Sequence, residues 1–334
     1  MNKKKIALIG GAGFIGHNLA IKLKERGHDP YIVDNLGVNN ILSFTNSEIE
    51  NRKLYWKILN ERMDLLNRNE IEINIEDARD YSALCRVIDL INPDVIVQLA
   101  AVSHANKSNK DPHNTFDHSL RTLENALDEA RSLGVHFIYF SSSMVYGNFT
   151  ENQVNEETVC NPMGIYGTLK YAGELIVKSY NQVFDLNYTI IRPSALYGER
   201  CVSRRVGQIF IENAVKGQNI KINGDGTDKL DFTYIDDLAK GVALVIEKKE
   251  SLNQTFNMTY GEARTIYDMA SILKENFNNI NIEYSSKDAL TPDRGTLNID
   301  KARSILGYEP TNPIEIGYPK YIEWYKKLWS KIEA

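Results

Sequence analysis

Short apolar runs alternate with longer amphipathic stretches over the first 190 residues of the chain. The short runs predict buried strands, because each is a nearly continuous string of aliphatic and aromatic residues. The longer stretches carry apolar residues at helical spacing. Such alternation is typical of a doubly wound α/β fold with a parallel sheet. The predicted strands are Ile6–Ile9, Tyr31–Val33, Ile71–Ile75, Val95–Leu99, His136–Phe140 and Tyr188–Ile191, and the predicted helices include Tyr81–Ile91, Leu120–Leu133 and Tyr166–Phe184.

The alternating pattern ends near Gly198. A polar stretch is followed by a predicted helix, Gly207–Lys216, and by a predicted pair of short strands around Ile220–Ile222 and Phe232–Ile235. We therefore expect a doubly wound domain over residues 1–190, to which segments around 230–260 return, and a smaller, discontinuous lobe formed mainly by residues 191–334. Ligands of doubly wound sheets bind beyond the carboxyl ends of the strands, so this lobe is expected to cap that edge.

One connection, Ser43–Asn69, is long for a link between neighbouring strands. It is rich in charged residues and also carries Tyr55 and Trp56. Its pattern predicts an exposed helical insert, and a part in dimerisation or in closure over a substrate is the alternative.

A glycine-rich turn joins the first predicted strand to the first helix. Gly10 permits a tight turn, Gly13 leaves room for a pyrophosphate, and Gly16 allows the helix to pack closely on the strand. The helix that begins near Phe14 and Ile15 directs free N–H groups at the phosphates. The second strand ends in Asp34, and a carboxylate there accepts hydrogen bonds from ribose hydroxyls and repels a 2′-phosphate. The sequence therefore predicts a Rossmann-type site for NAD, in which we include Asn35.

Two further patterns predict catalytic residues. Tyr166 and Lys170 are four residues apart, so on a helix they lie on one face. A lysine ammonium at that spacing stabilises a phenolate, which can remove a proton from a sugar hydroxyl. The run 141–143 consists of serines at the carboxyl end of a predicted strand, and Ser142 can hold the reacting oxygen against the tyrosine.

Composition and charge exclude several classes of partner. The chain is 43% hydrophobic and 25% charged, as in ordinary globular proteins, and its net charge of −5 gives no reason to expect nucleic acid. No apolar stretch approaches the roughly twenty residues of a membrane span. The three cysteines are scattered, so we expect no metal site and a cytoplasmic location.

Together these motifs resemble the extended short-chain dehydrogenase/reductase family, and within it the NAD-dependent nucleotide-sugar epimerases and dehydratases. The resemblance covers nearly the whole chain. It rests on the glycine turn, Asp34, the serine-rich strand end, the Tyr-x-x-x-Lys pair and the run Arg192–Gly198, and in the second half on Gly224–Thr227, Asp231–Leu238 and Lys301–Pro310.

The resemblance implies further roles. Ser142, Tyr166 and Lys170 align with the catalytic residues, Pro193 with a residue beside the nicotinamide, and Arg294 with one that meets the substrate's pyrophosphate. A homodimer through a four-helix contact that includes Tyr166–Phe184 is also implied. Asp77 and Ala78 would contact adenine, Leu99, Ala100 and Ala101 would lie along the cofactor, and Val102, Ser103 and His104 would reach toward the sugar.

Several positions depart from the family pattern. Ser143 and Met144 stand where the 4,6-dehydratases carry an acid, so water elimination and decarboxylation are disfavoured. Leu230 replaces a phosphate-binding arginine, with Lys229 beside it, and Ala195 and His118 replace asparagines. Arg204 and Arg205 are then candidates to hold the substrate's phosphates or base, with a solvated loop as the alternative.

The favoured function is an NAD-dependent nucleotide-sugar epimerase that oxidises the sugar at C4 and returns the hydride to the other face. An NAD-dependent 4-dehydrogenase or ketoreductase, which releases or takes up the 4-keto sugar, is the main alternative. A non-catalytic NAD-binding sensor on the same fold is a more remote one.

Overall fold

A seven-stranded parallel sheet forms the centre of the computed structural model, which describes residues 2–46, 48–102, 105–278, 280–287 and 291–333. The predicted doubly wound α/β fold is confirmed. Each strand predicted in the first 190 residues is a strand of this sheet, with ends that differ by at most two residues. In spatial order the strands are β12 (Gln254–Asn257), β7 (Tyr188–Arg192), β5 (His136–Phe140), β4 (Val95–Gln98), β1 (Lys5–Ile9), β2 (Asp29–Val33) and β3 (Glu72–Asn74).

The strand order reverses between β1 and β4. Ile9 pairs with Val33 of β2 on one side and with Gln98 of β4 on the other. The connections from these two strands leave in opposite directions, which opens a crevice at their carboxyl ends. Ile6, Ala7, Leu8 and Ile9 are fully buried, as expected of a strand covered on both faces.

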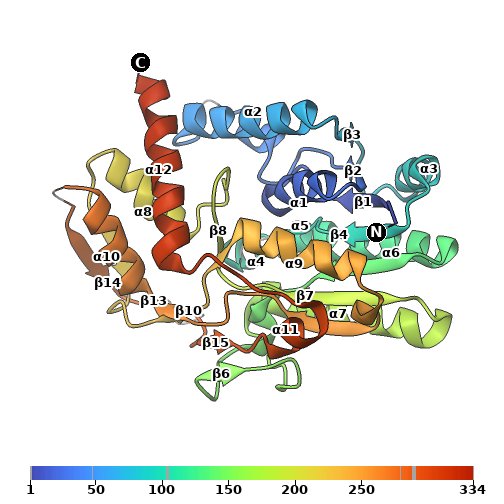
Figure 1. The fold of residues 1–334 in the computed structure, drawn as a ribbon. Coiled ribbons are helices and arrows are strands. Elements are labelled where there is room, and N and C mark those ends of the chain that lie inside the picture. The colour runs from blue at the N-terminus through green and yellow to red at the C-terminus, as the bar shows by residue number, and fades with distance from the viewer. Residues whose placement is uncertain (1, 47, 103–104, 279, 288–290, 334) are drawn as a thin grey trace.

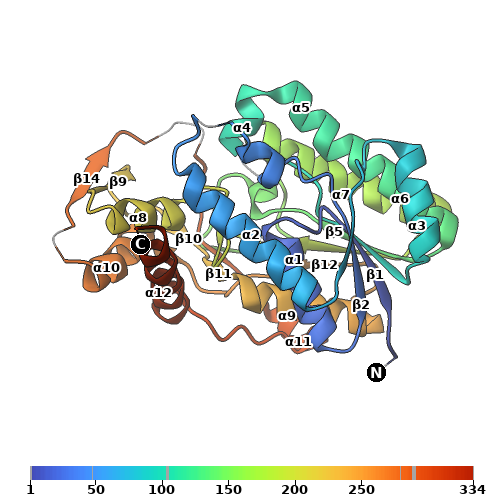
Figure 2. The same ribbon diagram turned by 90° about the horizontal axis from the view of Figure 1, so that it is seen from above.

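Helices cover both faces of the sheet (Figure 2). One face packs against α1 (Phe14–Glu25), α9 (Ile235–Glu247) and α11 (Asp300–Leu306). The other packs against α3 (Tyr81–Ile91), α6 (Thr122–Leu133) and α7 (Gly164–Phe184). Short helices α4 (Ala105–Lys110) and α5 (Pro112–Phe116) and a π-helical turn at Asp117–Arg121 precede α6.

The second lobe lies beside the sheet (Figure 1). Its core holds aromatic and aliphatic residues of α8 (Val206–Val215), α10 (Ile266–Asn276) and α12 (Ile314–Glu333). Its short strands pair across long stretches of sequence: β9 (Ile220–Asn223) with β14 (Ile282–Ser285), β10 (Lys229–Leu230) with β13 (Arg264–Thr265), β8 (Leu196–Tyr197) with β11 (Thr233–Tyr234), and β6 (Gln153–Val154) with β15 (Thr296–Leu297).

The predicted pairing of 220–222 with 232–235 is wrong. β9 pairs with β14, whereas β11 is only two residues long and pairs with β8. Ile235 is the first residue of α9 rather than the end of a strand. Partners so distant in sequence are chosen by packing of the lobe, which local patterns do not encode.

The prediction of an exposed insert at 43–69 is also wrong. Its helix α2 (Arg52–Arg68) follows a short 3₁₀ turn (Ile41–Phe44) and lies between α1 and α12 (Figure 2). Leu54, Tyr55, Ile58 and Leu59 are at most 2% exposed and belong to the core of the second lobe. The many charged residues of this stretch obscured its continuous apolar face in the sequence pattern.

Among the described residues, no helix is long and apolar enough to cross a membrane.

Candidate functional site

The glycine turn between β1 and α1 leaves a backbone-lined cradle. Gly10 has a φ of +80°, and a Cβ there would lie 2.6 Å from the Ala100 nitrogen. A Cβ on Gly16 would lie 2.5 Å from the Gly11 Cα, so only glycine allows α1 to pack this closely. Gly13 caps α1 without a side-chain hydrogen bond, which leaves the N–H groups of the first turn available to a ligand. A dinucleotide pyrophosphate fits this arrangement.

Asp34 lies at the end of β2 beside this turn. Its carboxylate accepts hydrogen bonds from the Ala12 N–H (3.0 Å) and the Leu36 N–H (2.7 Å). Burial raises the pKa of Asp34, while these two N–H groups and the nearby Arg62 guanidinium act in the opposite direction. The carboxylate is therefore held in one orientation at the floor of the crevice.

A cavity, here the cofactor cavity, runs along the glycine turn and the ends of β1, β2 and β4. Residues predicted from sequence to bind the cofactor line it: Gly10, Gly13, Phe14, Ile15, Gly16, Asp34, Asn35, Asp77, Ala78, Leu99, Ala100 and Ala101. Arg62 and Asn39 also line this cavity but were not predicted, because the sequence pattern did not show how the insert and the residues before it fold. His118 and Thr122, from the π-helical turn and the start of α6, also line the cavity.

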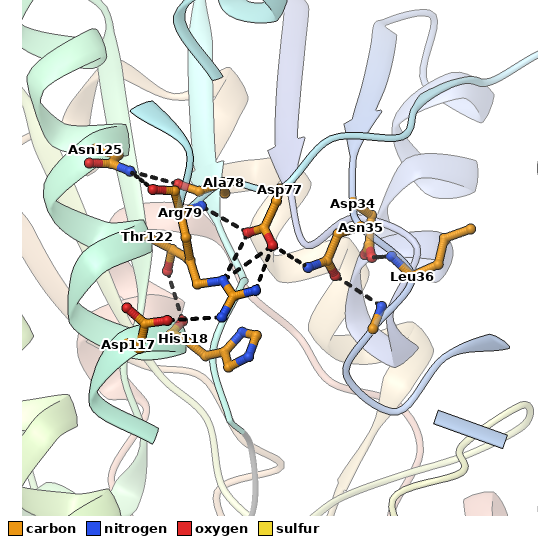
Figure 3. A network of polar contacts seen from close by, with 11 residues as sticks. Asp34, Asn35, Leu36, Asp77, Ala78, Arg79, Asp117, His118, Thr122 and Asn125 are labelled. Atoms are coloured by element: carbon orange, nitrogen blue, oxygen red, sulfur yellow. Dashed lines mark hydrogen bonds and ion pairs between the residues drawn. The ribbon is translucent and has the colours of Figure 1, made fainter. Parts of the chain in front are cut away.

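The adenine end predicted around Asp77 contains a polar network (Figure 3). Arg79 donates to the Asp77 carboxylate from Nε (3.0 Å) and Nη2 (2.7 Å), and Asn35 donates to it from Nδ2 (3.0 Å). These hydrogen bonds hold the pKa of Asp77 well below its ordinary value. Arg79 also reaches Asp117 (2.8 Å), so the loop after β3 is tied to the π-helical turn. Arg79 was not predicted, although its position two residues after Asp77 allows this contact.

A second cavity of about 490 Å³, here the reaction cavity, holds the predicted catalytic residues Ser142, Tyr166 and Lys170. Ser142 lies two residues after the end of β5 and caps a 3₁₀ turn (Ser143–Tyr146), and its Oγ accepts from the Met144 N–H (3.2 Å). Tyr166 and Lys170 are one turn apart near the start of α7. The buried Lys170 donates from Nζ to the Phe140 carbonyl (2.7 Å). Burial lowers the pKa of Lys170 to about 8, and Glu174 opposes this effect.

The two cavities share a wall. Ile15, Leu99, Ala101, Leu196 and Arg205 line both of them. The cofactor cavity along the glycine turn is therefore directly adjacent to the space beside Tyr166.

Cationic side chains from the second lobe line the reaction cavity: Arg204, Arg205, Lys221, Lys229 and Arg294. Burial is the main cause that lowers the pKa of Arg294 to about 10, and the nearby charge of Arg205 acts in the same direction. The Arg294 Nε has no hydrogen-bond partner among the described residues. Arg204 pairs with Glu50 of the insert (3.2 Å). Two neighbouring guanidiniums in one cavity favour an anionic ligand.

The other predicted cofactor and substrate residues are placed unevenly. Ser143 and Pro193 line the reaction cavity, and so does Ser194, which was not predicted and accepts the Ser143 hydroxyl (3.1 Å). Val102 follows the β4 end but is not among the lining residues of either cavity. Ser103 and His104 lie outside the described residues. Among the residues that the structure describes, no cluster of metal-ligating side chains occurs.

Comparison with known proteins agrees with this geometry. The model of the NAD dependent epimerase/dehydratase family matches residues 6–259. A putative UDP-glucose 4-epimerase of Methanocaldococcus jannaschii is 30% identical over 334 residues, covering 96% of this chain and 98% of the relative.

Solved structures give the same picture. The Thermotoga maritima UDP-glucose 4-epimerase with UDP-glucose superimposes with a TM-score of 0.84 at 27% identity, over 97% of this chain and 99% of that one. A Bacillus cereus UDP-glucuronic acid 4-epimerase mutant, in complex with a 4-deoxy-4-fluoro substrate analogue and NAD, gives 0.84 at 25% identity over the same shares. The chain therefore belongs to the NAD-dependent epimerase/dehydratase family, within the extended short-chain dehydrogenases/reductases.

Proposed function

We propose that the chain is a nucleotide-sugar 4-epimerase that keeps NAD bound along the glycine turn. One observation carries this proposal: Ser142, Tyr166 and Lys170 line a cavity that shares a wall with the cofactor cavity. Bound there, NAD supplies a hydride acceptor beside the sugar.

The residues of the reaction cavity divide the work. Tyr166 takes the proton from the C4 hydroxyl, and Ser142 holds the same oxygen by a hydrogen bond. Lys170 stabilises the tyrosine phenolate by its charge and holds the ribose next to the nicotinamide. Pro193 closes the wall beside the nicotinamide and donates no hydrogen bond. Inversion at C4 would follow when the keto sugar has turned over and takes back, on its other face, the hydride that the bound NAD would hold, and Tyr166 would return its proton to the same oxygen.

The phosphates of the nucleotide are held by the second lobe. Arg294 and Arg205 supply the positive charge, with Lys229 at the rim and Arg204 braced by Glu50. This set takes over the task of the arginine that Leu230 replaces. The volume of about 490 Å³ accommodates a hexose joined to a diphosphate. The relatives named UDP-glucose epimerases favour a uridine nucleotide, and we propose a UDP-hexose as substrate.

Epimerisation rather than elimination follows from the absence of an acid after Ser142. Ser143 and Met144 line the cavity and neither can donate a proton to a leaving hydroxyl at C6. We also propose that residues 1–190, with segments around 230–260, form the NAD-binding domain and that 191–334 form mainly the substrate lobe. A cytoplasmic homodimer with α7 in its interface completes the proposal.

The test compares Tyr166→Phe with Tyr171→Phe on the same helix. We expect Tyr166→Phe to lose roughly 10²- to 10⁴-fold in turnover of UDP-glucose and UDP-galactose and to retain NAD, whereas Tyr171→Phe stays near wild type. Undiminished activity of Tyr166→Phe would exclude the enzyme assignment. Mass analysis of released cofactor and sugar products separates the alternatives, because a free 4-keto sugar with net NADH formation identifies a 4-dehydrogenase instead.

A further inference from the structure

A buried acid–base pair lies one helical turn beyond the catalytic lysine. Glu174 of α7 is fully buried, and Arg192, the last residue of β7, is 2% exposed. Arg192 donates to the Glu174 carboxylate from Nε (2.9 Å) and Nη2 (2.6 Å). The proposed reaction uses neither residue. Charged groups are rarely buried this completely unless their pairing serves a purpose.

The pair ties three elements of the reaction cavity together. The Ser141 hydroxyl, next to Ser142 at the end of β5, donates to Glu174 Oε1 (2.5 Å). Arg192 directly precedes Pro193 and donates from Nη1 to the Tyr146 hydroxyl (2.9 Å). The helix with Tyr166 and Lys170 is thereby fixed against both strand ends that carry the other site residues.

The pair is also oriented. Glu174 is one turn from Lys170 on the same helix and acts on the lysine's charge, whereas the guanidinium faces Tyr146, with its ring 4.9 Å away. The other groups around the lysine are the Phe140 carbonyl and the Tyr139 ring of β5, with Lys170 Nζ 5.2 Å from the ring, and Tyr166 on α7. Glu174 is therefore the carboxylate whose charge acts on this ammonium, from one helical turn away and without a direct ion pair.

Burial by itself disfavours a charged lysine, and a neutral lysine would not stabilise a phenolate. A carboxylate near the lysine would favour its charged form, but an unpaired carboxylate is itself costly to bury. Pairing with Arg192 and the hydrogen bond from Ser141 keep the carboxylate ionised, and its charge still acts on Lys170 one turn away.

We propose that Glu174 and Arg192 are positioning residues for Lys170: Glu174 keeps the lysine protonated, and Arg192 holds the Glu174 carboxylate in place, moderates its effect on the lysine and keeps α7 in register with Ser142 during turnover. This inference rests on the proposed function, since it concerns the same lysine. It assigns the pair a role in tuning the reaction, separate from holding the fold.

The test removes the negative end or the positive end of the pair and compares the two pH profiles. Glu174→Gln removes the negative end, so Lys170 loses its proton more easily, and the alkaline decline of kcat should move to lower pH by roughly one unit or more. Arg192→Gln removes the positive charge that offsets Glu174, so the carboxylate acts more strongly on Lys170 and the decline should move to higher pH. Arg192→Lys should restore a profile near wild type. Glu124→Gln, on the surface of α6, is the control and should shift nothing.

A purely structural role predicts a different outcome. Loss of packing would lower kcat in both variants without moving their pH profiles in opposite directions, and that result would overturn the proposal. ¹³C NMR titration of Lys170 Cε, in protein with the cofactor it carries from purification, measures the same two shifts without relying on turnover. This measurement still decides the role of the pair if Tyr166→Phe proves active and the proposed reaction fails. Circular dichroism identifies any variant that does not fold, in which case Ser141→Ala, which removes one hydrogen-bond donor from the Glu174 carboxylate and leaves its charge in place, should move the lysine titration in the direction of Arg192→Gln.

Discussion

A methyl group added to either of two glycines in the same turn should have different effects: at Gly16 it should destabilise the fold, and at Gly13 it should weaken NAD binding. Gly16 lies inside α1, where alanine is intrinsically preferred by about 1 kcal/mol. A Cβ at this position would, however, lie 2.5 and 2.6 Å from the Cα and carbonyl carbon of Gly11. These are backbone atoms, so the helix itself must move. Overpacking of this kind costs about 1–3 kcal/mol, and we expect Gly16→Ala to lower the free energy of unfolding of the cofactor-free protein by about 1–2 kcal/mol.

Gly13 offers the contrast. Its φ of −72° suits alanine, and a Cβ there meets only the Gly10 carbonyl oxygen, at 3.2 Å. The methyl group would instead occupy the cofactor cavity. Gly13→Ala should therefore unfold like wild type without NAD but lose the stabilisation that NAD provides, which is about 2.7 kcal/mol for a ligand at 100 times its Kd.

The assay is urea unfolding of both variants and wild type, stripped of cofactor, with and without added NAD. Gly27→Ala serves as a control, because its φ of +87° strains alanine while nothing lies within 4 Å of the added Cβ and Gly27 does not line the cofactor cavity. The reasoning is refuted if Gly13→Ala binds NAD like wild type, or if Gly16→Ala unfolds at the wild-type midpoint.

Three further predictions concern stability. Ala195 has a φ of +37°, so Ala195→Gly should raise the free energy of unfolding by about 0.5–1 kcal/mol, and a decrease in chemical denaturation would contradict the strain argument. Burial raises the pKa of Asp231 to about 6 from 3.8, so the folded protein holds this proton more tightly than the unfolded chain. The free energy of unfolding should then fall as pH rises from about 4 to about 6 and level off above, and Asp231→Asn should flatten this slope in unfolding curves measured across that range. In α2, Leu59→Ala should cost about 2–5 kcal/mol, whereas Asn60→Ala on the exposed side should change the free energy by less than about 0.5 kcal/mol; equal effects in urea unfolding would show that α2 is not part of the core.

The parts of the fold that depend on neighbouring residues were predictable. The strands of the first 190 residues are continuous apolar runs because both faces of a parallel sheet are covered, and this leaves a clear trace in the sequence. The glycine turn and the spacing of Tyr166 and Lys170 are equally local, since backbone geometry fixes what they can do. The bounds of α3, Tyr81–Ile91, agree with the prediction because Asp80 caps its first turn through the Ala83 N–H.

The wrong predictions and the missed residues depend on contacts between segments that are far apart in the sequence. The sequence of α2 predicts an exposed helix because its mean hydropathy is low. Its apolar face nevertheless packs in the core of a lobe formed by residues more than 130 positions later. β9 and β14 pair across about sixty residues, and no local pattern marks that choice. Ser194 and Arg79 are polar residues without a distinctive motif, and only packing shows that they face the cavity or its support.

The sequence by itself therefore determined the class of fold and the dinucleotide turn, and it indicated the residues that we propose act on the sugar, because each depends on chemistry within one or two turns of chain. Only the tertiary structure decided which groups surround Lys170. Glu174 is one turn away in sequence, but the Arg192 that neutralises it ends β7 and the Ser141 that hydrogen-bonds to it directly follows β5. The charge of a buried lysine depends on everything within a few ångströms, and that set is assembled only by folding.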